Sequence, residues 1–444
     1  MPRPDWQNIP FAPRRCPFFY GWVIAAVSTI GIIASIPGQT MGVGVFTDDL
    51  IAVLKLDRFQ LAAAYAVGTI ASSLLLPFAG QLQDRVGTRV MVIASSFGLG
   101  ISLVLFANCG RLAGAVDGGS IVPSMIVAFG CFLAIRFCGQ GCLTVASRVA
   151  IGKWFNHRRG LATGISSVVV VFGFNLSPRI LNDMVQAYGW QMTALVLAGL
   201  VGIGMTIIGA VFFRENPEAC GLVMDGVSDE AWHKKMAAKV PDVHKEFTRG
   251  EAVRTWAFWA FSLGTATQSL LITAITFHVA SLGEELGMSR DMSYAVFLPM
   301  TWFALVSNFF GGWLSDRIHL KWLLITMMVA EIVMTASLTR FNEPTARALF
   351  IVSGGIAGGL FNPLATVSWP RFFGRAHLGA ISGLHMSIMV FASAIGPVLF
   401  AVGRKYTGSY RAVELACIAL PAAILLCSFK VKNPQELLID GAAA

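Results

Sequence analysis

The stretch GQLQDRVGTR, residues 80–89, lies in a short charged break between two long apolar segments. The stretch GWLSDRIHLK, residues 312–321, repeats its Gly-x-Leu-x-Asp-Arg pattern about half the chain later, again between two apolar segments. Two copies of one loop at this spacing indicate a duplicated membrane protein whose halves place the same loop at the same point. A duplicated helical bundle with a cleft between its halves is a common construction among solute carriers.

The composition indicates a membrane protein over the whole length of the chain. Its 444 residues are 55% hydrophobic and 13% charged, whereas soluble domains contain about 25% charged residues. Apolar runs of about 20 residues, each enough to cross a bilayer, recur along the chain. The net charge of +9 fits lysines and arginines in cytoplasmic loops, so it does not indicate nucleic-acid binding. The eight cysteines have no metal-like spacing, and we expect neither a metal nor a cofactor.

We expect every span to be a helix, because a backbone that faces lipid must satisfy its own hydrogen bonds. The twelve predicted spans are 18–46, 59–80, 90–112, 121–150, 160–187, 190–213, 254–282, 290–314, 322–340, 344–369, 379–403 and 410–430. The predicted fold class is an all-α membrane protein with twelve transmembrane helices in two six-helix bundles. The predicted bundles are residues 1–213 and 251–444, joined by a polar cytoplasmic linker at 214–250 that contains Lys234, Lys235 and Lys239.

The basic residues predict the orientation of the spans. With both termini in the cytoplasm, the inner loops, the linker and the tails hold most of the 33 lysines and arginines. The reverse topology would invert that bias, which contradicts the positive-inside rule. We therefore expect a multi-pass protein of the cell membrane with both termini in the cytoplasm.

These motifs resemble the major facilitator superfamily over essentially the whole chain. Residues 80–89 resemble its signature loop between spans two and three, and RFCGQG, residues 136–141, resembles its Arg-x-x-x-Gln-Gly motif in span four. The sequence FNHRRGLATG, residues 155–164, is partly repeated at the start of span eleven, in residues 373–383. Together with GVF at 44–46, it makes the chain similar to the branch of monocarboxylate and oxalate/formate carriers.

The chain departs from that branch in its anion-binding charges. Span one carries Gln39-Thr40-Met41-Gly42 where monocarboxylate carriers typically have a lysine. Span eight offers only Asn308 near the place of their Asp and Arg pair. Span eleven has His385 where oxalate/formate carriers use a basic residue. The departures put lactate and oxalate as substrates in doubt.

The resemblance implies a transporter driven by a gradient, and no enzymatic motif is present. The expected function is secondary active transport of a small organic anion, such as a monocarboxylate, by alternating access with proton coupling. The alternative is an exporter of amphipathic or drug-like compounds, although residues 173–178 match the glycine-rich Gly-Pro motif of such exporters only in part. The expected partners are a small-molecule solute and the lipid bilayer, with no nucleic acid and a monomeric chain.

The two charged loops form a candidate conformational latch. Asp84 is short and anionic, so it can cap a nearby helix N-terminus, where the helix dipole is positive. Glycines in the loop allow close approach of helices and a tight turn. The predicted latch residues are Gly80, Asp84, Arg85, Gly87, Arg89, Gly312, Asp316 and Arg317. The alternative is a pair of solvated turns that only set the topology.

Ionisable residues inside the spans are candidates for the functional site, because a charge at the bilayer centre costs about 2.5–3.5 kcal/mol on insertion scales. Arg136 is a candidate for coupling or substrate binding, with a buried structural role as the alternative. Arg179 is a candidate anion-binding residue, since its planar fork binds a carboxylate through two hydrogen bonds. A structural pair with Asp183, four residues on, is the alternative. His385 is a candidate for both substrate binding and coupling.

Polar residues of the spans complete the predicted substrate site. They are Gln39, Thr40, Gln268 and Asn362. The pairs Pro37-Gly38 and Asn362-Pro363 predict helix breaks in spans one and ten, which free backbone groups to bind solute. Hydrogen bonding between helices, with no ligand, is the alternative for each residue.

Overall fold

The computed structural model describes residues 5–114, 121–227 and 243–442. Within these ranges the chain is helical and contains no β-strand. Eleven of the described helices are long and apolar enough to cross a membrane. The lysines at 234, 235 and 239 of the predicted linker lie outside the described residues.

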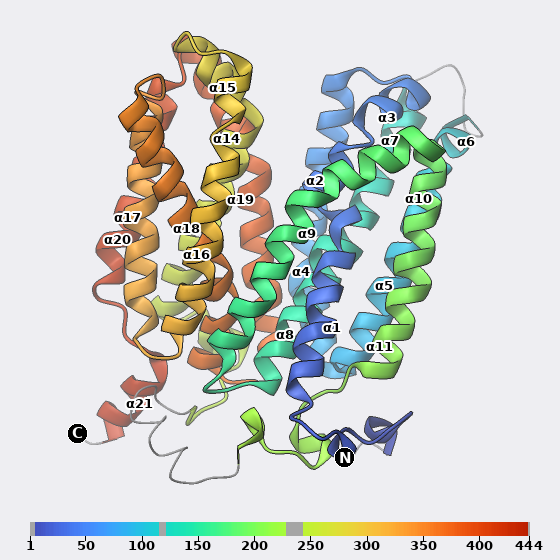
Figure 1. Ribbon diagram of the computed structural model, residues 1–444, viewed down its shortest axis with the longest axis vertical. Helices are drawn as coiled ribbons and strands as arrows, with labels where there is room; N and C mark the ends of the chain where they lie inside the picture. Colours follow the sequence, from blue (N-terminus) through green and yellow to red (C-terminus); the bar gives the residue numbers. More distant parts are fainter. Residues whose placement is uncertain (1–4, 115–120, 228–242, 443–444) are drawn as a thin grey trace. The chain divides into compact units, whose positions relative to one another are not determined.

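The eleven long helices correspond to predicted spans two to twelve (Figure 1). They are α4 (Arg58–Val86), α5 (Thr88–Ala107), the helix Val122–Trp154, α9 (Arg159–Tyr188), the helix Trp190–Phe212, α14 (Trp256–Glu285), the helix Arg290–Ser315, α17 (Leu320–Leu338), α18 (Pro344–Phe373), α19 (Leu378–Thr407) and α20 (Arg411–Ser428). The first span is shorter and consists of α1 (Gly21–Ala34), a 3-10 turn at Ile36–Gly38 and α2 (Thr40–Gly44). The predicted fold class of twelve transmembrane helices is therefore confirmed.

Three of the long helices are composite. The helix Val122–Trp154 consists of α7 (Val122–Ile135), a π-helix at Arg136–Leu143 and α8 (Thr144–Trp154). The helix Trp190–Phe212 consists of α10 (Trp190–Gly199), a second π-helix at Leu200–Met205 and α11 (Thr206–Phe212). The helix Arg290–Ser315 consists of α15 (Arg290–Tyr294) and α16 (Phe297–Ser315).

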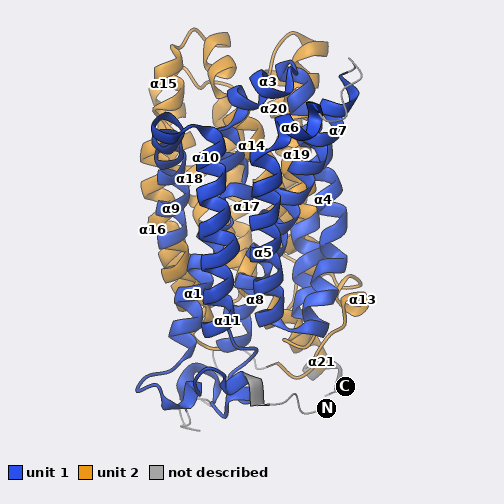
Figure 2. Ribbon diagram, turned by 90° about the vertical axis from the view of Figure 1, so that its right-hand side faces the viewer, with its two compact units in different colours: residues 1–155, 169–228, 378–387 blue, residues 156–168, 229–377, 388–444 orange. Residues whose placement is uncertain are grey.

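The chain forms two compact units, each of which includes a short segment from the other half of the sequence (Figure 2). Unit 1 contains residues 1–155, 169–228 and 378–387, and unit 2 contains residues 156–168, 229–377 and 388–444. Residues 156–168 include the start of α9, and residues 378–387 form the start of α19. Each predicted half therefore contributes one helix start to the opposite unit.

The two predicted helix breaks have different outcomes. The break in span one is confirmed, because α1 ends at Ala34 and Pro37 lies in the 3-10 turn. The break in span ten is wrong, because α18 continues through Asn362 and Pro363. A proline removes one backbone donor, and the buried ring of Pro363 packs near Gly311 of α16. The α18 backbone therefore stays helical at this point.

Candidate functional site

The break in the first span lies against the π-helix Arg136–Leu143, inside unit 1. A Cβ atom on Gly38 would lie 2.4 Å from the Ile135 carbonyl oxygen and 2.9 Å from the Cα atom of Gly139. Only glycine at position 38 therefore permits this approach of the two backbones. Short π-helical segments frequently occur at functional sites.

Arg136 is the charged residue of this junction. Its side chain is buried, and its Nη1 atom donates to the Gly38 carbonyl at 3.2 Å and to the Thr40 hydroxyl at 3.3 Å. The Tyr65 hydroxyl donates to the same Thr40 oxygen at 2.9 Å, and the guanidinium carbon lies 5.2 Å from the centre of the Tyr65 ring. One edge of the guanidinium is thus fixed by the protein, and an aromatic ring lies over its face.

The opposite edge of Arg136 has no acceptor among the described residues. Neither Nε nor Nη2 makes a hydrogen bond with any residue that the structure describes. No ion pair joins Arg136 to an acidic side chain among the same residues. The Nε and Nη2 edge is the one that forms parallel hydrogen bonds with a carboxylate. The geometry therefore presents an unused bidentate anion-binding edge.

Hydroxyl and amide groups also link the first span to the start of α8. Gln39 Nε2 donates to the Ser35 hydroxyl at 3.1 Å and lies 3.4 Å from the Thr144 hydroxyl. The Thr144 hydroxyl in turn donates to Ser35 at 3.1 Å. We call Ser35, Gln39, Thr40, Tyr65, Arg136 and Thr144 the α1 cluster. Three of the predicted site residues, Gln39, Thr40 and Arg136, belong to it.

The prediction missed Tyr65 and Thr144. Tyr65, Thr69 and Ser72 are spaced i, i+4 and i+7 along α4, which places them on one helix face. This polar stripe in an apolar span was a usable signal for Tyr65. Thr144 directly follows the π-helix, and that irregularity changes the helix face on which it lies.

The other predicted substrate residues lie outside the α1 cluster. Arg179 and Asp183 of α9 are both exposed, and no ion pair between them is present in the described part of the chain. His385 is buried in the α19 segment of unit 1, within electrostatic range of Arg148 of α8. Gln268 of α14 and Asn362 of α18 belong to unit 2, where Gln268 is buried beside Gly358.

The two aspartates of the charged loops each cap the N-terminus of a helix. Asp84 accepts hydrogen bonds from the backbone N–H groups of Gly379 and Ala380, both at 2.7 Å, at the start of α19. Asp316 accepts from Gly160 at 2.8 Å and from Leu161 at 2.9 Å, at the start of α9. A carboxylate at this position interacts favourably with the helix dipole. The same contact is therefore made once inside each unit.

Glycines bring the helices together beside each cap. In unit 1 a Cβ atom on Gly80 would lie 2.2 Å from the Gly379 carbonyl oxygen, and one on Gly383 would lie 3.0 Å from the Cα atom of Gly80. In unit 2 a Cβ atom on Gly160 would lie 2.1 Å from the Gly312 carbonyl oxygen. Helix pairs separated only by small residues can pack backbone to backbone. The repeated sequences at 155–164 and 373–383 therefore supply matching glycine contacts.

The remaining latch residues have separate roles. Gly87 has a φ of 93° between α4 and α5, a conformation that favours glycine. Arg89 is buried and donates to the backbone carbonyls of Ile9, at 2.9 Å, and Ala210. Arg317 donates to the Trp313 carbonyl at 2.8 Å and lies over the indole ring of the same residue. Arg85 is exposed.

Asp316 has a cation partner that no sequence motif indicated. The Arg371 guanidinium of α18 lies 3.2 Å from Asp316 Oδ1, and both side chains are buried. Burial raises the pKa of Asp316 from 3.8 to about 6, against the opposing effects of Arg371 and the two backbone N–H donors. The carboxyl is therefore ionised at pH 7 and becomes neutral as the pH falls below about 6.

Replacing Asp316 by asparagine is expected to destabilise the purified protein by about 3–5 kcal/mol, because it leaves the buried Arg371 without its counter-charge. Thermal unfolding at pH 7 measures the effect. Arg317→Gln is the matched control, since the exposed Arg317 side chain contacts, among the residues that the structure describes, only Trp313 of its own helix end. Equal unfolding temperatures for the two variants would contradict the assigned role of Asp316.

Comparison with known proteins identifies the family. The family model described as Major Facilitator Superfamily matches residues 18–301 and 260–443. A probable sulfoacetate transporter of Cupriavidus necator is 22% identical over 406 residues, which cover 88% of this chain and 86% of that protein. Monocarboxylate transporter 14 of Mus musculus is 24% identical over 199 residues, which cover 45% of this chain and 36% of that protein.

Solved structures show the same fold. A proton:xylose symporter superposes with a TM-score of 0.69 at 13% identity, covering 95% of this chain and 98% of that chain. A human organic anion transporter superposes with a TM-score of 0.62 at 14% identity, covering 91% of this chain and 98% of that chain. The chain belongs to the Major Facilitator Superfamily, whose members carry small-molecule solutes across membranes and are not enzymes.

Proposed function

We propose that this protein is a secondary active transporter of a small organic anion. The observation that carries the proposal is the open Nε and Nη2 edge of Arg136, which is buried and has no acidic partner among the described residues. A buried charge without a counter-charge is costly. A carboxylate or sulfonate of the substrate would supply that counter-charge and fit the guanidinium fork.

The names of the relatives support the anionic class. Sulfoacetate, named for the Cupriavidus necator relative, carries a carboxylate and a sulfonate. A second relative is named as a monocarboxylate carrier. Thr40 accepts a hydrogen bond from Arg136, Gln39 precedes Thr40 in the chain, and both are half-buried, so they are the proposed polar contacts for the rest of the substrate. Arg179, Gln268 and Asn362 remain candidates for further contacts.

We propose that transport proceeds by alternating access and is coupled to protons. The two aspartate caps must open when α4 separates from α19 and when α16 separates from α9. A charged hydrogen bond contributes about 1.5–3 kcal/mol, so the caps are strong enough to bias the closed cytoplasmic state and weak enough to break. His385 is the proposed proton site, because an arginine such as Arg136 does not lose its proton in proteins.

The proposed setting is the cell membrane, with a monomeric chain and both termini in the cytoplasm. This orientation places the Asp84 and Asp316 loops on the cytoplasmic side, where the basic residues of the loops are expected. Accessibility labelling of single cysteines introduced at exposed Arg85, in the last turn of α4, and at exposed Arg290, at the start of α15, would test the orientation, because the proposed topology puts these two positions on opposite sides of the membrane.

Thermal unfolding against a panel of solutes tests the proposed substrate class. The panel holds sulfoacetate, monocarboxylates, dicarboxylates, sugars and lipophilic cations. An anion at 100 times its dissociation constant is expected to add about 2.7 kcal/mol of apparent stability, and Arg136→Gln is expected to remove that gain. Stabilisation by lipophilic cations alone would favour an exporter of amphipathic compounds and contradict the proposal.

A further inference from the structure

A pocket at one end of unit 1 is separate from the α1 cluster. It has a volume of about 480 Å³ and is lined by Val53, Ala107, Asn108, Gly110, Arg111, Trp190, Gln191 and Leu195. These residues come from α3 (Thr47–Leu54), the end of α5, α6 (Cys109–Gly114) and the start of α10. The pocket therefore lies where two membrane spans end, opposite the Asp84 loop.

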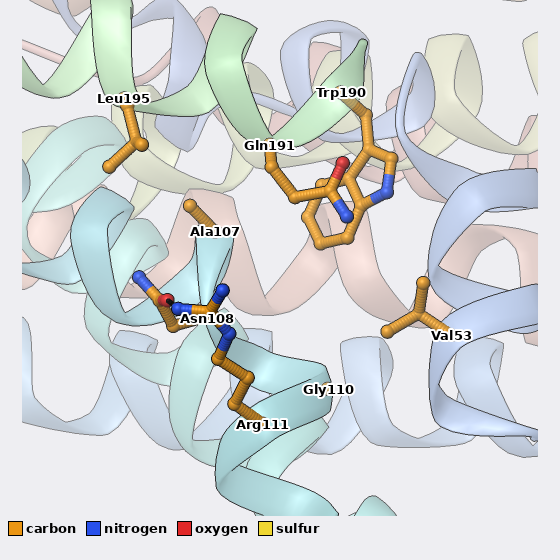
Figure 3. A pocket seen from close by; sticks show the side chains of 8 residues that line it. All are labelled: Val53, Ala107, Asn108, Gly110, Arg111, Trp190, Gln191 and Leu195. Atoms are coloured by element: carbon orange, nitrogen blue, oxygen red, sulfur yellow. Dashed lines mark hydrogen bonds between the residues drawn. The ribbon is translucent and has the colours of Figure 1, made fainter.

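The polar lining is rich in hydrogen-bond donors. Figure 3 shows Arg111 and Asn108 on one side of the pocket, with Trp190 and Gln191 of α10 facing them. Arg111 is the one charged residue among the described residues of the lining, and Asn108 Oδ1 lies 3.4 Å from its Nη1 atom. The Trp190 indole N–H and the Gln191 amide make no hydrogen bond with a described residue. A positive charge with free N–H donors around it suits a phosphate or another oxyanion.

The surroundings of the pocket are apolar and exposed. Ile101 and Leu105 of α5 are exposed, as are Leu195 and Leu200 on the helix that begins at Trp190. Helices α5 and α10 pack against each other, so these side chains follow the same helix pair away from the pocket and into the span. A ligand with a charged head and apolar chains matches this pattern, because its chains can lie along exposed leucine and isoleucine.

We infer that this pocket binds the phosphodiester headgroup of an anionic phospholipid, with the acyl chains along α5 and α10. Arg111 supplies the charge, and Trp190 and Gln191 supply hydrogen bonds. Arginine and tryptophan side chains also anchor helices at the membrane interface. A free phosphate has the same oxyanion chemistry as the headgroup but has no acyl chains to contact the apolar residues of α5 and α10.

Native mass spectrometry of the purified full chain tests the inference with phosphatidylglycerol and phosphatidylcholine of the same acyl chains. We expect one phosphatidylglycerol to be retained in preference to phosphatidylcholine. Arg111→Gln is expected to weaken phosphatidylglycerol binding about tenfold, by loss of a charge-assisted hydrogen bond. Leu195→Trp, which fills the pocket without changing its charge, is also expected to weaken binding.

Arg58→Gln is the matched control, because Arg58 is an exposed arginine of unit 1 that pairs with Asp48 and lies outside the pocket. It is expected to leave lipid binding unchanged. Equal retention of the two lipids, or equal losses in Arg111→Gln and Arg58→Gln, would overturn the site. Displacement of the lipid by glycerol 3-phosphate or inorganic phosphate at the same concentration would identify a site for soluble anions instead.

Discussion

Arg136→Gln is expected to lower uptake of a stabilising carboxylate, such as sulfoacetate, by about thirtyfold or more. Removing one partner of a buried, hydrogen-bonded charge pair costs about 2–5 kcal/mol, and each 1.4 kcal/mol is about a tenfold change in binding. The Nε and Nη2 edge of Arg136 has no other acceptor among the described residues. Uptake into proteoliposomes measures the effect, with thermal unfolding of the same preparations to confirm that the variant is folded.

Two further variants separate substrate binding from a structural role of Arg136. Arg136→Lys keeps the charge but loses the planar fork. This variant is therefore expected still to be stabilised by the anion, but with a higher dissociation constant. Arg179→Gln is the competing arginine variant, because Arg179 is the other arginine proposed to contact the substrate and lies outside the α1 cluster. If Arg179→Gln abolishes uptake while Arg136→Gln retains anion-induced stabilisation, the binding arginine is Arg179 and Arg136 only supports the fold.

Gly160→Ala is expected to destabilise the protein by about 1–3 kcal/mol, the usual cost of overpacking, and to lower uptake at least about tenfold. The new methyl group would lie 2.1 Å from the backbone oxygen of Gly312, and a backbone atom cannot rotate away. The start of α9 must then move, which takes the Gly160 and Leu161 N–H groups away from Asp316. Thermal unfolding and proteoliposome uptake together measure the result.

Gly130→Ala is the matched control for this substitution. Gly130 is a helical glycine of α7, and a Cβ atom there would meet nothing within 4 Å. Alanine in such a helix position normally stabilises by about 0.5–1 kcal/mol. The two substitutions are therefore expected to change the free energy of unfolding in opposite directions. A gain of stability in Gly160→Ala would show that the close contact between α9 and α16 is dispensable.

The sequence predicted the spans and the charged loops because their signals are local. A run of apolar residues specifies a spanning helix by itself, and the Asp-Arg loop is contiguous in both copies. Asp84 and Asp316 were therefore found from the motif alone. The two carboxylates accept hydrogen bonds from backbone N–H groups of Gly379, Ala380, Gly160 and Leu161. Almost every residue has a backbone N–H group, so the sequence does not indicate which residues donate.

The α1 cluster was predicted only in part. Gln39, Thr40 and Arg136 were recognisable as polar residues in apolar spans, but their mutual contacts depend on the π-helix at 136–143. A π-helix has more residues per turn than an α-helix. The α-helical period of about 3.6 residues therefore does not predict which helix face Arg136 and Thr144 occupy. The wrong prediction at Pro363 has a related cause. Proline weakens a helix locally, and tertiary packing decides whether the helix bends.

The start of α9 belongs to unit 2 and the start of α19 belongs to unit 1, which has a consequence for biosynthesis. Gly80 and Asp84 are made early, whereas their partners Gly379 and Ala380 are translated after most of unit 2. Chains emerge from the ribosome at about 5–20 residues per second. Many seconds therefore pass between the synthesis of α4 and the synthesis of the Gly379 and Ala380 N–H groups that Asp84 caps. Unit 1 is therefore the first to begin insertion and cannot be finished until translation has passed residue 387.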